Sequence, residues 1–557
     1  MPRPDRLPQT PQARARWSCP PEVLILGLSL WLLAVDHQRF FMLVSEHAGP
    51  GRAALMVALS VALVALNALL LAVLAPGRLL RPVAVVLVVV AALSSYFSDR
   101  YGVYLDPSML RNVLHTQPAE ARELLGGALA WHLLWHAGPP LAVLALLPVR
   151  PRPWLRALVW RSGLAVGSVG VLVLAVLMSF QPLASLMRNH KELRYLLSPS
   201  AALWSTARVL SFDAQAAAGP RQAVGLDATR IRPAPDRAQL LVIVVGETAR
   251  AANWGLNGYA RQTTPGLAER GVINFAEVHS CGTNTEVSVP CLFAPVGRRD
   301  YDEARIRRSE SLLHVLVRAG IGVQWVDNQT GCKGVCEGLP TTTVEELHPV
   351  GLCEGGRCLD EGLLAGLDER LTRLHGQQVL VLHMLGNHGP SYFRRYPEAF
   401  ARFQPACRED ELQRCSREAI VNAYDNALLY TDHVLSRLID TLATHADRVD
   451  SAMLYVSDHG ESLGESGLYL HGLPYAMAPA EQTRVPMVMW LSPGYARASG
   501  LDTGCLARRA AQPAQHDHVF HTVLALTGVG TALYEPTWDL TRGCRRSPDP
   551  VLAGEAR

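Results

Sequence analysis

Five long apolar stretches in the first third of the chain restrict its fold more than any other feature of the sequence. They occupy residues 21–43, 53–75, 79–97, 128–149 and 159–180. A helix needs about 20 mostly apolar residues to cross a bilayer, so each stretch is long enough to span a membrane. The first carries Asp36, His37 and Arg39 near its end, which leaves that end open. Because no small-residue cleavage site follows it, a membrane helix is favoured over a cleaved signal peptide.

The arginines beside these stretches indicate how the chain is oriented. They precede the first stretch and occupy the connections between the second and third and between the fourth and fifth: Arg3, Arg6, Arg14, Arg16, Arg78, Arg81, Arg150, Arg152 and Arg156. Short connections rich in Arg and Lys face the cytoplasm. With five spans all of these segments lie on that side, and everything after residue 180 lies outside the cytoplasmic membrane.

The cysteines support the same orientation. Ten of the 11 follow the last apolar stretch, mostly as close neighbours. Such spacing is typical of disulfides formed in an oxidising compartment. A cysteine metal site is disfavoured because the matched CxxC knuckles of zinc ribbons are missing. Pairing of neighbours would join Cys281 with Cys291, Cys332 with Cys336, Cys353 with Cys358, Cys407 with Cys415, and Cys505 with Cys544.

The remainder of the chain predicts a separate α/β domain. Short β-rich runs at 240–245, 322–326, 378–384, 452–456 and 486–491 alternate with helical patterns, of which the longest covers 417–445. Alternation of this kind predicts a mostly parallel sheet covered by helices. We expect a transmembrane domain at 1–213, a linker at 214–238 and a soluble catalytic domain at 239–557. The formal charge of +3, without a basic stripe interleaved with aromatic residues, argues against a nucleic-acid partner.

Two segments outside the apolar stretches predict amphipathic helices on the external side. In residues 101–125 the side chains of Asn112, Thr116 and Glu120 recur every four positions and share one helix face. By spacing alone this is a solvated face. Residues 190–212 show a similar pattern and predict an interfacial helix on the membrane.

Polar residues follow three of the predicted strands. Glu247 comes two residues after the strand that ends at Val245, and Asp458 and His459 follow the strand that ends at Val456. His388 comes after the strand at 378–384. Ligands of α/β sheets bind at the carboxyl ends of the strands. Carboxylates and imidazoles are the ligands of catalytic zinc, so the sequence predicts a metal site at this edge.

A candidate nucleophile lies between Cys281 and Cys291. This segment offers three hydroxyls, those of Thr283, Thr285 and Ser288. A helix that begins near Thr285 would turn its backbone N–H groups toward an anionic phosphate. The residues alone do not choose among the three hydroxyls, since each could instead cap the helix.

Several runs together resemble the lipid A phosphoethanolamine transferases, which belong to the alkaline phosphatase and sulfatase superfamily. They are Val245-Gly-Glu-Thr-Ala-Arg250, Leu256-Asn-Gly-Tyr259, the segment 281–291, Asn387-His-Gly-Pro390, Ser457-Asp-His-Gly-Glu-Ser462 and His471-Gly-Leu-Pro-Tyr475. The resemblance extends over nearly the whole chain, including the five spans. Glu286 departs from the pattern, because a small residue is common beside the nucleophile.

The resemblance implies roles for matching positions. Thr285 is implied as the nucleophile, and it completes a zinc site with Glu247, Asp458 and His459. A second group would contact the donor phosphate or hold a second zinc: His388, His471, Lys333 and Glu461. Asn112, Thr116 and Glu120 would line the lipid-donor site, which reverses the reading of that face as merely solvated.

The implied activity is transfer of phosphoethanolamine from phosphatidylethanolamine to a lipid A phosphate through a covalent phosphoethanolamine-threonine, with one or two Zn²⁺ ions. The expected location is the bacterial inner membrane, with the catalytic domain in the periplasm and resistance to cationic peptides such as polymyxin as the consequence. Alternatives are a membrane-anchored phosphatase, phosphodiesterase or sulfatase, a transferase acting on a core sugar or glucan, and a non-catalytic binding protein. A transporter is disfavoured because spans two to five carry few polar residues.

Overall fold

The computed structural model describes residues 18–48, 51–116, 118–150, 152–217, 219, 221–232 and 235–545, without the side chains of 118–120 and 212–217. The chain divides into two compact units, one formed by Met1–Arg100 with Gly127–Trp204 and the other by Tyr101–Gly126 with Ser205–Arg557. Segment 101–126 therefore groups with the second unit, although it connects two apolar stretches in the sequence.

The first unit is built from apolar helices. They are α1 (Pro21–Asp36), α2 (Gln38–His47), α3 (Arg52–Leu74), α4 (Leu80–Tyr101), α7 (Gly127–His136), α8 (Gly138–Leu146), α9 (Trp154–Met178) and α10 (Phe180–Asn189), followed by a 3₁₀ turn at Lys191–Leu196. Among the described residues, three helices are individually long and apolar enough to cross a membrane, namely α3, α9 and α4 with the turn before it.

The other two expected spans are broken helices. The pair α1 and α2 bends by 62° and the pair α7 and α8 by 47°, so the part of the chain that is described contains up to five spans if each pair counts as one. The breaks coincide with polar or helix-breaking sequence. Asp36 and His37 lie at the first, and Gly138 with two prolines follows the second. The five predicted apolar segments correspond to these helices. The first and the fourth segment, however, form bent pairs of helices and not straight spans.

The second unit contains a mixed, mostly parallel sheet. Over the described residues it has eight strands in the order β13-β3-β12-β9-β2-β8-β4-β5. Their bounds are β2 (Ala238–Gly246), β3 (Ile273–His279), β4 (Gly322–Asp327), β5 (Thr341–Thr343), β8 (Gln377–His383), β9 (Val449–Ser457), β12 (Arg484–Leu491) and β13 (Ala514–Gln515). Strand β12 runs antiparallel to both of its neighbours, and the remaining pairs are parallel.

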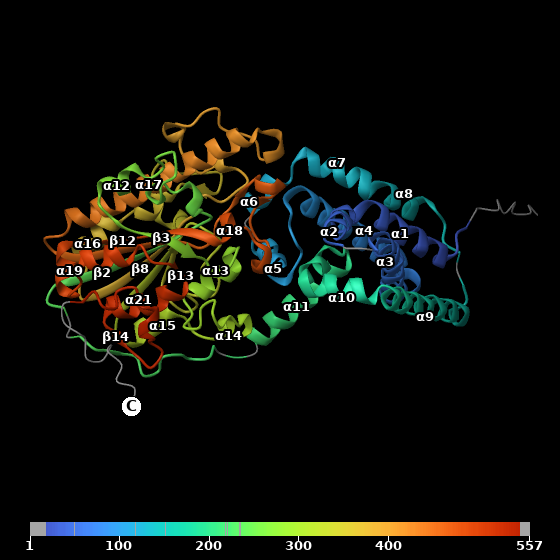
Figure 1. Cartoon of the computed structure of the whole chain (residues 1–557), viewed down its shortest axis with the longest axis horizontal. Helices are drawn as coiled ribbons and strands as arrows, with labels where there is room; N and C mark the ends of the chain where they lie inside the picture. Colours follow the sequence, from blue (N-terminus) through green and yellow to red (C-terminus); the bar gives the residue numbers. More distant parts are fainter. Residues whose placement is uncertain are drawn as a thin grey trace, which may run out of the picture. The chain divides into compact units, whose positions relative to one another are not determined.

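Helices cover both faces of this sheet (Figure 1). On one face lie α12 (Pro265–Glu269), α16 (Leu367–Arg373) and α17 (Arg417–Thr444), and on the other α15 (Leu312–Arg318) and α21 (Asp517–Thr527). Strand β2 shows why the sequence builds this sandwich. Its residues Leu240, Val242 and Val244 pack in the α17 core, whereas Leu241, Ile243 and Val245 pack in the α21 core. A strand buried on both faces is a continuous apolar run.

The single helix expected over 101–125 was wrong. The structure has α5 (Pro107–His115) and α6 (Pro118–Leu124), and Thr116 between them adopts an extended backbone with φ −65° and ψ 135°. Pro118 is the first residue of α6, a position at which proline is favoured because its missing N–H has no partner to lose there. The segment 190–212 is likewise split, into the 3₁₀ turn Lys191–Leu196 and α11 (Ser200–Ala217).

Replacing a buried leucine of α17 should destabilise the second unit. Leu435 is fully buried, whereas Leu226 of the same unit is 74% exposed. We expect Leu435→Ala to cost about 2–5 kcal/mol, because it leaves a cavity, and Leu226→Ala to stay within about 0.5 kcal/mol. Thermal unfolding of the full chain in detergent measures the difference. Equal melting temperatures for the two variants would contradict the placement of α17 in the core.

Candidate active site and metal centre

Two adjacent strands deliver the candidate metal ligands. Strands β2 and β9 pair in parallel up to Gly246 and Ser457, so the next residues, Glu247 and Asp458, leave the sheet side by side. His459 follows directly. All three side chains are fully buried, and one ligand atom of each lies within 4.8 Å of the others. Three of the four predicted metal ligands therefore lie together at the carboxyl ends of the strands, as a group that could hold a metal ion.

The hydroxyl of Thr285 joins this cluster. Its Oγ1 lies 3.0 Å from Glu247 Oε2 and 3.4 Å from His459 Nε2. Thr285 begins α13 (Thr285–Leu292), which a disulfide between Cys281 and Cys291 ties to the preceding loop. The hydroxyl is thus fixed at a helix N-terminus, where backbone N–H groups favour a bound phosphate.

The structure distinguishes the three hydroxyls that the sequence left open. Thr283 donates its hydroxyl to the backbone oxygen of Leu473 at 2.6 Å. Ser288 accepts a hydrogen bond from the backbone of Gly282 at 3.0 Å. The cap of α13 is Asn284, whose side chain accepts from Val287 N. Thr285 therefore does not cap the helix, and of the three hydroxyls it is the one that contacts the carboxylate cluster.

The spacing of the four groups suits a tetrahedral metal. Glu247 Oε1 lies 3.2 Å from His459 Nε2, and Asp458 Oδ2 lies 3.4 Å from the same nitrogen. Zinc bonds of about 2.0–2.1 Å place tetrahedral ligand atoms roughly 3.3 Å apart. Asp458 Oδ2 is buried, and no group in the described part of the chain donates a hydrogen bond to it. Burial of an unpaired carboxylate oxygen is costly, so the site is built for a cation.

The pKa values of the cluster also indicate that it requires positive charge. Although burial opposes it, Asp458 and Glu247 raise the pKa of His459 to about 10. Burial and the charge of Glu247 raise the pKa of Asp458 to about 7, and His459 holds the pKa of Glu247 well below its usual value despite burial. The two carboxylates thus favour the protonated, positively charged form of the imidazole. A bound metal ion would supply positive charge in the same place. His459 Nδ1 lies 2.9 Å from Gly460 O, which orients Nε2 toward the cluster.

Three further predicted residues lie beside the cluster. The ring of His471 is 4.3 Å from that of His459 and 5.3 Å from that of His388. Glu461 is fully buried, its Oε1 lies 3.3 Å from His471 Nδ1, and burial raises the pKa of its carboxyl to about 8. The structure therefore gathers these side chains on one side of His459.

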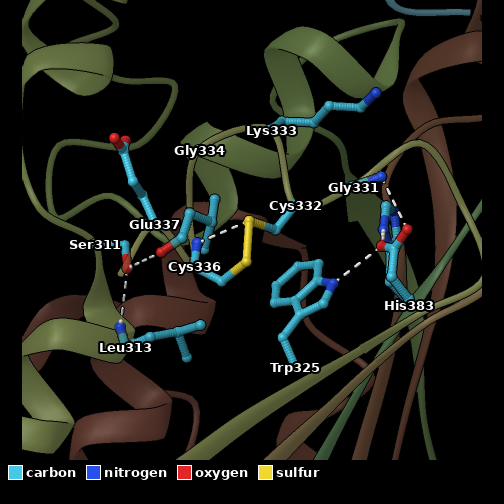
Figure 2. The surroundings of a disulfide bond; sticks show 12 residues. Ser311, Leu313, Trp325, Gly331, Cys332, Lys333, Gly334, Cys336, Glu337 and His383 are labelled. Carbon is cyan, nitrogen blue, oxygen red and sulfur yellow. Dashed lines mark hydrogen bonds and ion pairs between the residues drawn. A yellow bond between two sulfur atoms is a disulfide. The ribbon is translucent and has the colours of Figure 1, made fainter. Parts of the chain in front are cut away.

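Lys333 lies on a short loop closed by the disulfide between Cys332 and Cys336 (Figure 2). Asp327, at the end of β4, anchors this loop. It accepts hydrogen bonds from Gly331 N and from Trp325 Nε1, and it lies 2.8 Å from His383 Nδ1. Neither Asp327 nor His383 was predicted. The sequence feature that could have revealed Asp327 is an aspartate at the end of a buried strand.

Glu286, the unusual neighbour of Thr285, is the partner of Lys333. Its Oε1 lies 3.3 Å from Lys333 Nζ and 2.8 Å from His115 Nδ1, and Oε2 lies 3.2 Å from Arg307 Nη2. Although burial opposes it, this basic surrounding lowers the pKa of Glu286 to about 2. The carboxylate therefore ties α13 to α5, to α14 (Glu303–Arg308) and to the loop of Lys333. His115 and Arg307 were not predicted.

The expected donor-binding face is only partly described. Thr116 donates its hydroxyl to Asn112 O at 2.8 Å, within its own turn, and the side chain of Glu120 lies outside the described residues. Helix α5 itself reaches α13, since Asn284 Nδ2 lies 3.4 Å from Ser108 Oγ. A cavity of about 340 Å³ is lined by Arg122, Arg357 and Arg395. Arg395 Nε donates to His388 O at 2.7 Å, so one wall of this cavity contacts the backbone of His388.

The remaining disulfides follow the neighbour pairing expected from the spacing. Besides the two already described, the structure joins Cys353 with Cys358, Cys407 with Cys415, and Cys505 with Cys544. Cys19 is not part of a disulfide.

Together, an alkaline-phosphatase-like sandwich, a buried carboxylate–histidine cluster that could hold a metal and a buried threonine indicate a membrane-anchored enzyme of the alkaline phosphatase and sulfatase superfamily. Comparison with known proteins narrows this class. The sulfatase family model matches residues 239–529, and the model for phosphoethanolamine transferase EptA/EptB matches residues 63–214. The chain belongs to the phosphoethanolamine transferase family and is a multi-pass membrane protein.

Individual relatives cover most of the chain. Phosphoethanolamine transferase EptA of Escherichia coli K12 is 40% identical over 84% of this chain and 86% of its own. Phosphatidylethanolamine transferase Mcr-1 from Escherichia coli is 38% identical over 92% and 96%. The solved structure of the integral membrane lipooligosaccharide phosphoethanolamine transferase A of Neisseria meningitidis is 39% identical, has a TM-score of 0.89, and covers 94% of this chain and 99% of its own.

Gly386 packs closely against the backbone of Glu247, a candidate metal ligand. Gly386 has φ +55°, and a Cβ there would meet Glu247 O at 2.5 Å. We expect Gly386→Ala to displace Glu247 and lower bound zinc and transferase activity at least tenfold. Gly376→Ala is the matched control, because Gly376 has φ +65° with open space around it. Metal analysis and lipid assays of both variants test this; equal zinc and activity in the two would show that the close approach is unimportant.

Proposed function

We propose that this chain transfers phosphoethanolamine from phosphatidylethanolamine to a phosphate of lipid A through a covalent intermediate on Thr285. Family membership supports the transferred group. The position of Thr285 carries the rest of the proposal, since its hydroxyl lies at the N-terminus of α13 and 3.0 Å from a buried carboxylate.

Glu247, Asp458, His459 and Thr285 are proposed to hold Zn²⁺. Their donor set and their separations of 3.0–3.4 Å fit tetrahedral zinc. A metal ion bound there supplies Lewis acidity, which favours the ionised form of the Thr285 hydroxyl and offsets charge on the phosphoryl group. One such site accounts for these four residues, and His388 with His471 would be the candidates for a second.

The two half-reactions use the same oxygen. Thr285 Oγ1 loses its proton, attacks the phosphorus of phosphatidylethanolamine and forms a new P–O bond. The bond from phosphorus to the glycerol oxygen breaks, and diacylglycerol leaves with a proton. A lipid A phosphate oxygen then attacks the same phosphorus, the bond to Thr285 breaks and the threonine hydroxyl is restored. Such sequential transfer through an enzyme side chain is ping-pong chemistry.

The surroundings of Thr285 suit an anionic reaction centre. Lys333, His388 and His471 are proposed to contact the phosphoryl oxygens, and Glu461 orients His471 through the contact of 3.3 Å. Asn112 and Thr116, with Glu120, are proposed to line the donor site. The cavity lined by Arg122, Arg357 and Arg395 is proposed to receive the lipid acceptor, because Arg395 donates to the backbone oxygen of His388 and so connects the cavity with the candidate phosphate site.

The catalytic unit is proposed to lie in the periplasm of a bacterial inner membrane. Disulfides in this unit support an oxidising compartment. A relative from Campylobacter jejuni, 38% identical with a TM-score of 0.52, is described as the C-terminal periplasmic domain of phosphoethanolamine transferase EptC. Addition of an amine would offset negative charge on lipid A and weaken the binding of polymyxin.

Replacement of Thr285 tests the covalent step. Thr285→Ala removes the attacking oxygen, so we expect modified lipid A to fall by at least about 1,000-fold. Thr285→Ser keeps a hydroxyl at the same position and should retain part of the activity. Mass spectrometry of lipid A from expressing cells measures the product. Mass analysis of the chain incubated with phosphatidylethanolamine alone should find the headgroup on residue 285.

The acceptor is tested in the same assay. Purified chain is incubated with a fluorescent phosphatidylethanolamine analogue, with and without lipid A. Transfer that depends on lipid A supports the proposal. Rapid headgroup release without lipid A would favour a phosphodiesterase, and normal lipid A modification by Thr285→Ala would exclude the threonine intermediate.

Removal of the metal tests the zinc assignment. The full chain in detergent should lose headgroup release after dialysis against a strong chelator and regain it with Zn²⁺. Glu247→Gln should lower bound zinc by about one equivalent, because one carboxylate ligand is gone. Glu277→Gln serves as control, since Glu277 is a 41% exposed glutamate of the same unit. Full activity of the chelated chain would refute the zinc dependence.

A further inference from the structure

The membrane unit contains a second cluster of metal-ligating side chains. Asp36 is the last residue of α1, Ser95 belongs to α4, and His132 and His136 are one turn apart on α7. Ser95 Oγ donates to Asp36 Oδ1 at 2.9 Å and lies 3.0 Å from His132 Nε2. His136 Nδ1 lies 2.9 Å from the same Asp36 oxygen. One ligand atom each from Asp36, His132 and His136 lies within 4.8 Å of the others.

The cluster coincides with both helix breaks of this unit. Helix α1 ends at Asp36, and the chain bends by 62° before it continues as α2. Helix α7 ends at His136 and bends by 47° into α8. Broken helices at membrane depth need partners for the polar groups that the break exposes. Here two breaks that are about 100 residues apart in the sequence are joined through one carboxylate.

The carboxylate of Asp36 is not satisfied by these contacts. Its side chain is 1% exposed, and Oδ1 is bonded to Ser95 and His136, whereas Oδ2 is buried and accepts no hydrogen bond from the described residues. A buried carboxylate oxygen without a partner carries a large desolvation cost. Ionisable groups in membrane helices are rare and typically mark a functional site. The unpaired oxygen of Asp36 therefore indicates that a cation binds here.

The ligand types restrict which cation fits. Two imidazoles at positions i and i+4 of one helix face the same side, and with a carboxylate they form a ligand set for zinc-like metals. Mg²⁺ and Ca²⁺ prefer oxygen ligands. The hydroxyl of Ser95, which contacts two of the three groups, stands where a further ligand or a hydrogen-bond donor to a ligand would be.

We propose that Asp36, His132 and His136 bind a divalent transition metal, with Zn²⁺ as the matching ion, and that this metal fastens the two helix breaks to each other. The site is separate from the catalytic centre and does not depend on the proposed transfer reaction. Its role is structural, because no nucleophile other than the hydrogen-bonded Ser95 accompanies the ligands among the contacts described for them.

Metal analysis of the full chain in detergent tests the proposal. The catalytic unit is first silenced with Glu247→Gln and Asp458→Asn, together with His388→Gln and His471→Gln at the candidates for a second zinc, so that metal held by the membrane unit can be measured alone. This chain should still bind about one equivalent of Zn²⁺, and Zn²⁺ should raise its melting temperature. Co²⁺ in place of Zn²⁺ should give the visible absorption of a cobalt ion with nitrogen and oxygen ligands.

Further substitutions in this background identify the ligands. His132→Gln, His136→Gln and Asp36→Asn should each lose the residual Zn²⁺, the rise in melting temperature and the cobalt spectrum. His47→Gln should keep all three, since His47 is an exposed histidine of the same unit that bonds to Leu43 O. Absence of Zn²⁺ from the silenced chain would overturn the proposal. So would equal Zn²⁺ binding by His132→Gln and His47→Gln, and the cobalt spectrum of the silenced chain decides the matter even where a ligand variant fails to fold.

Discussion

The parallel pairing of β2 with β9 is the constraint on which the catalytic centre depends. Because the two strands stay in register to Gly246 and Ser457, Glu247 and Asp458 leave the sheet at the same edge and at the same depth. Both carboxylates are fully buried, which would be prohibitive without positive charge. The backbone arrangement thus creates the need for a cation, and His459 and Thr285 complete its surroundings.

Much of the site at the carboxyl ends of β2 and β9 could be predicted from the sequence, for a physical reason. Central strands of a parallel sheet are buried on both faces, so they appear as continuous apolar runs, and polar residues directly after them mark the ligand-binding edge. Glu247, Asp458 and His459 followed from that pattern. The prediction for segment 101–125 failed because its four-residue spacing was extended across Pro118, which begins a second helix.

Contacts between distant parts of the chain could not be predicted. The choice of Thr285 over Thr283 and Ser288 depends on where Leu473 and Gly282 place their backbone groups. Likewise, Glu286 is surrounded by bases that come from α5, from α14 and from the loop after β4. In the sequence alone, a glutamate next to the proposed nucleophile looks unfavourable for a phosphate site. In the structure its charge is offset by three basic side chains, so it orders the elements around Thr285.

In the two proposals above, the same ligand chemistry serves two different purposes in this chain. At the sheet edge, rigid strands fix the carboxylates, and a hydroxyl at the start of α13 shares the cluster, which is the arrangement that covalent catalysis requires. In the membrane unit the ligands come from the ends of broken helices, and the hydroxyl of Ser95 is already engaged by Asp36 and His132. Ligands at a break hold together segments that would otherwise separate, because a bend leaves backbone groups and polar side chains without their helical partners. A metal there would therefore stabilise the membrane unit, whereas a metal at the sheet edge would take part in phosphoryl transfer.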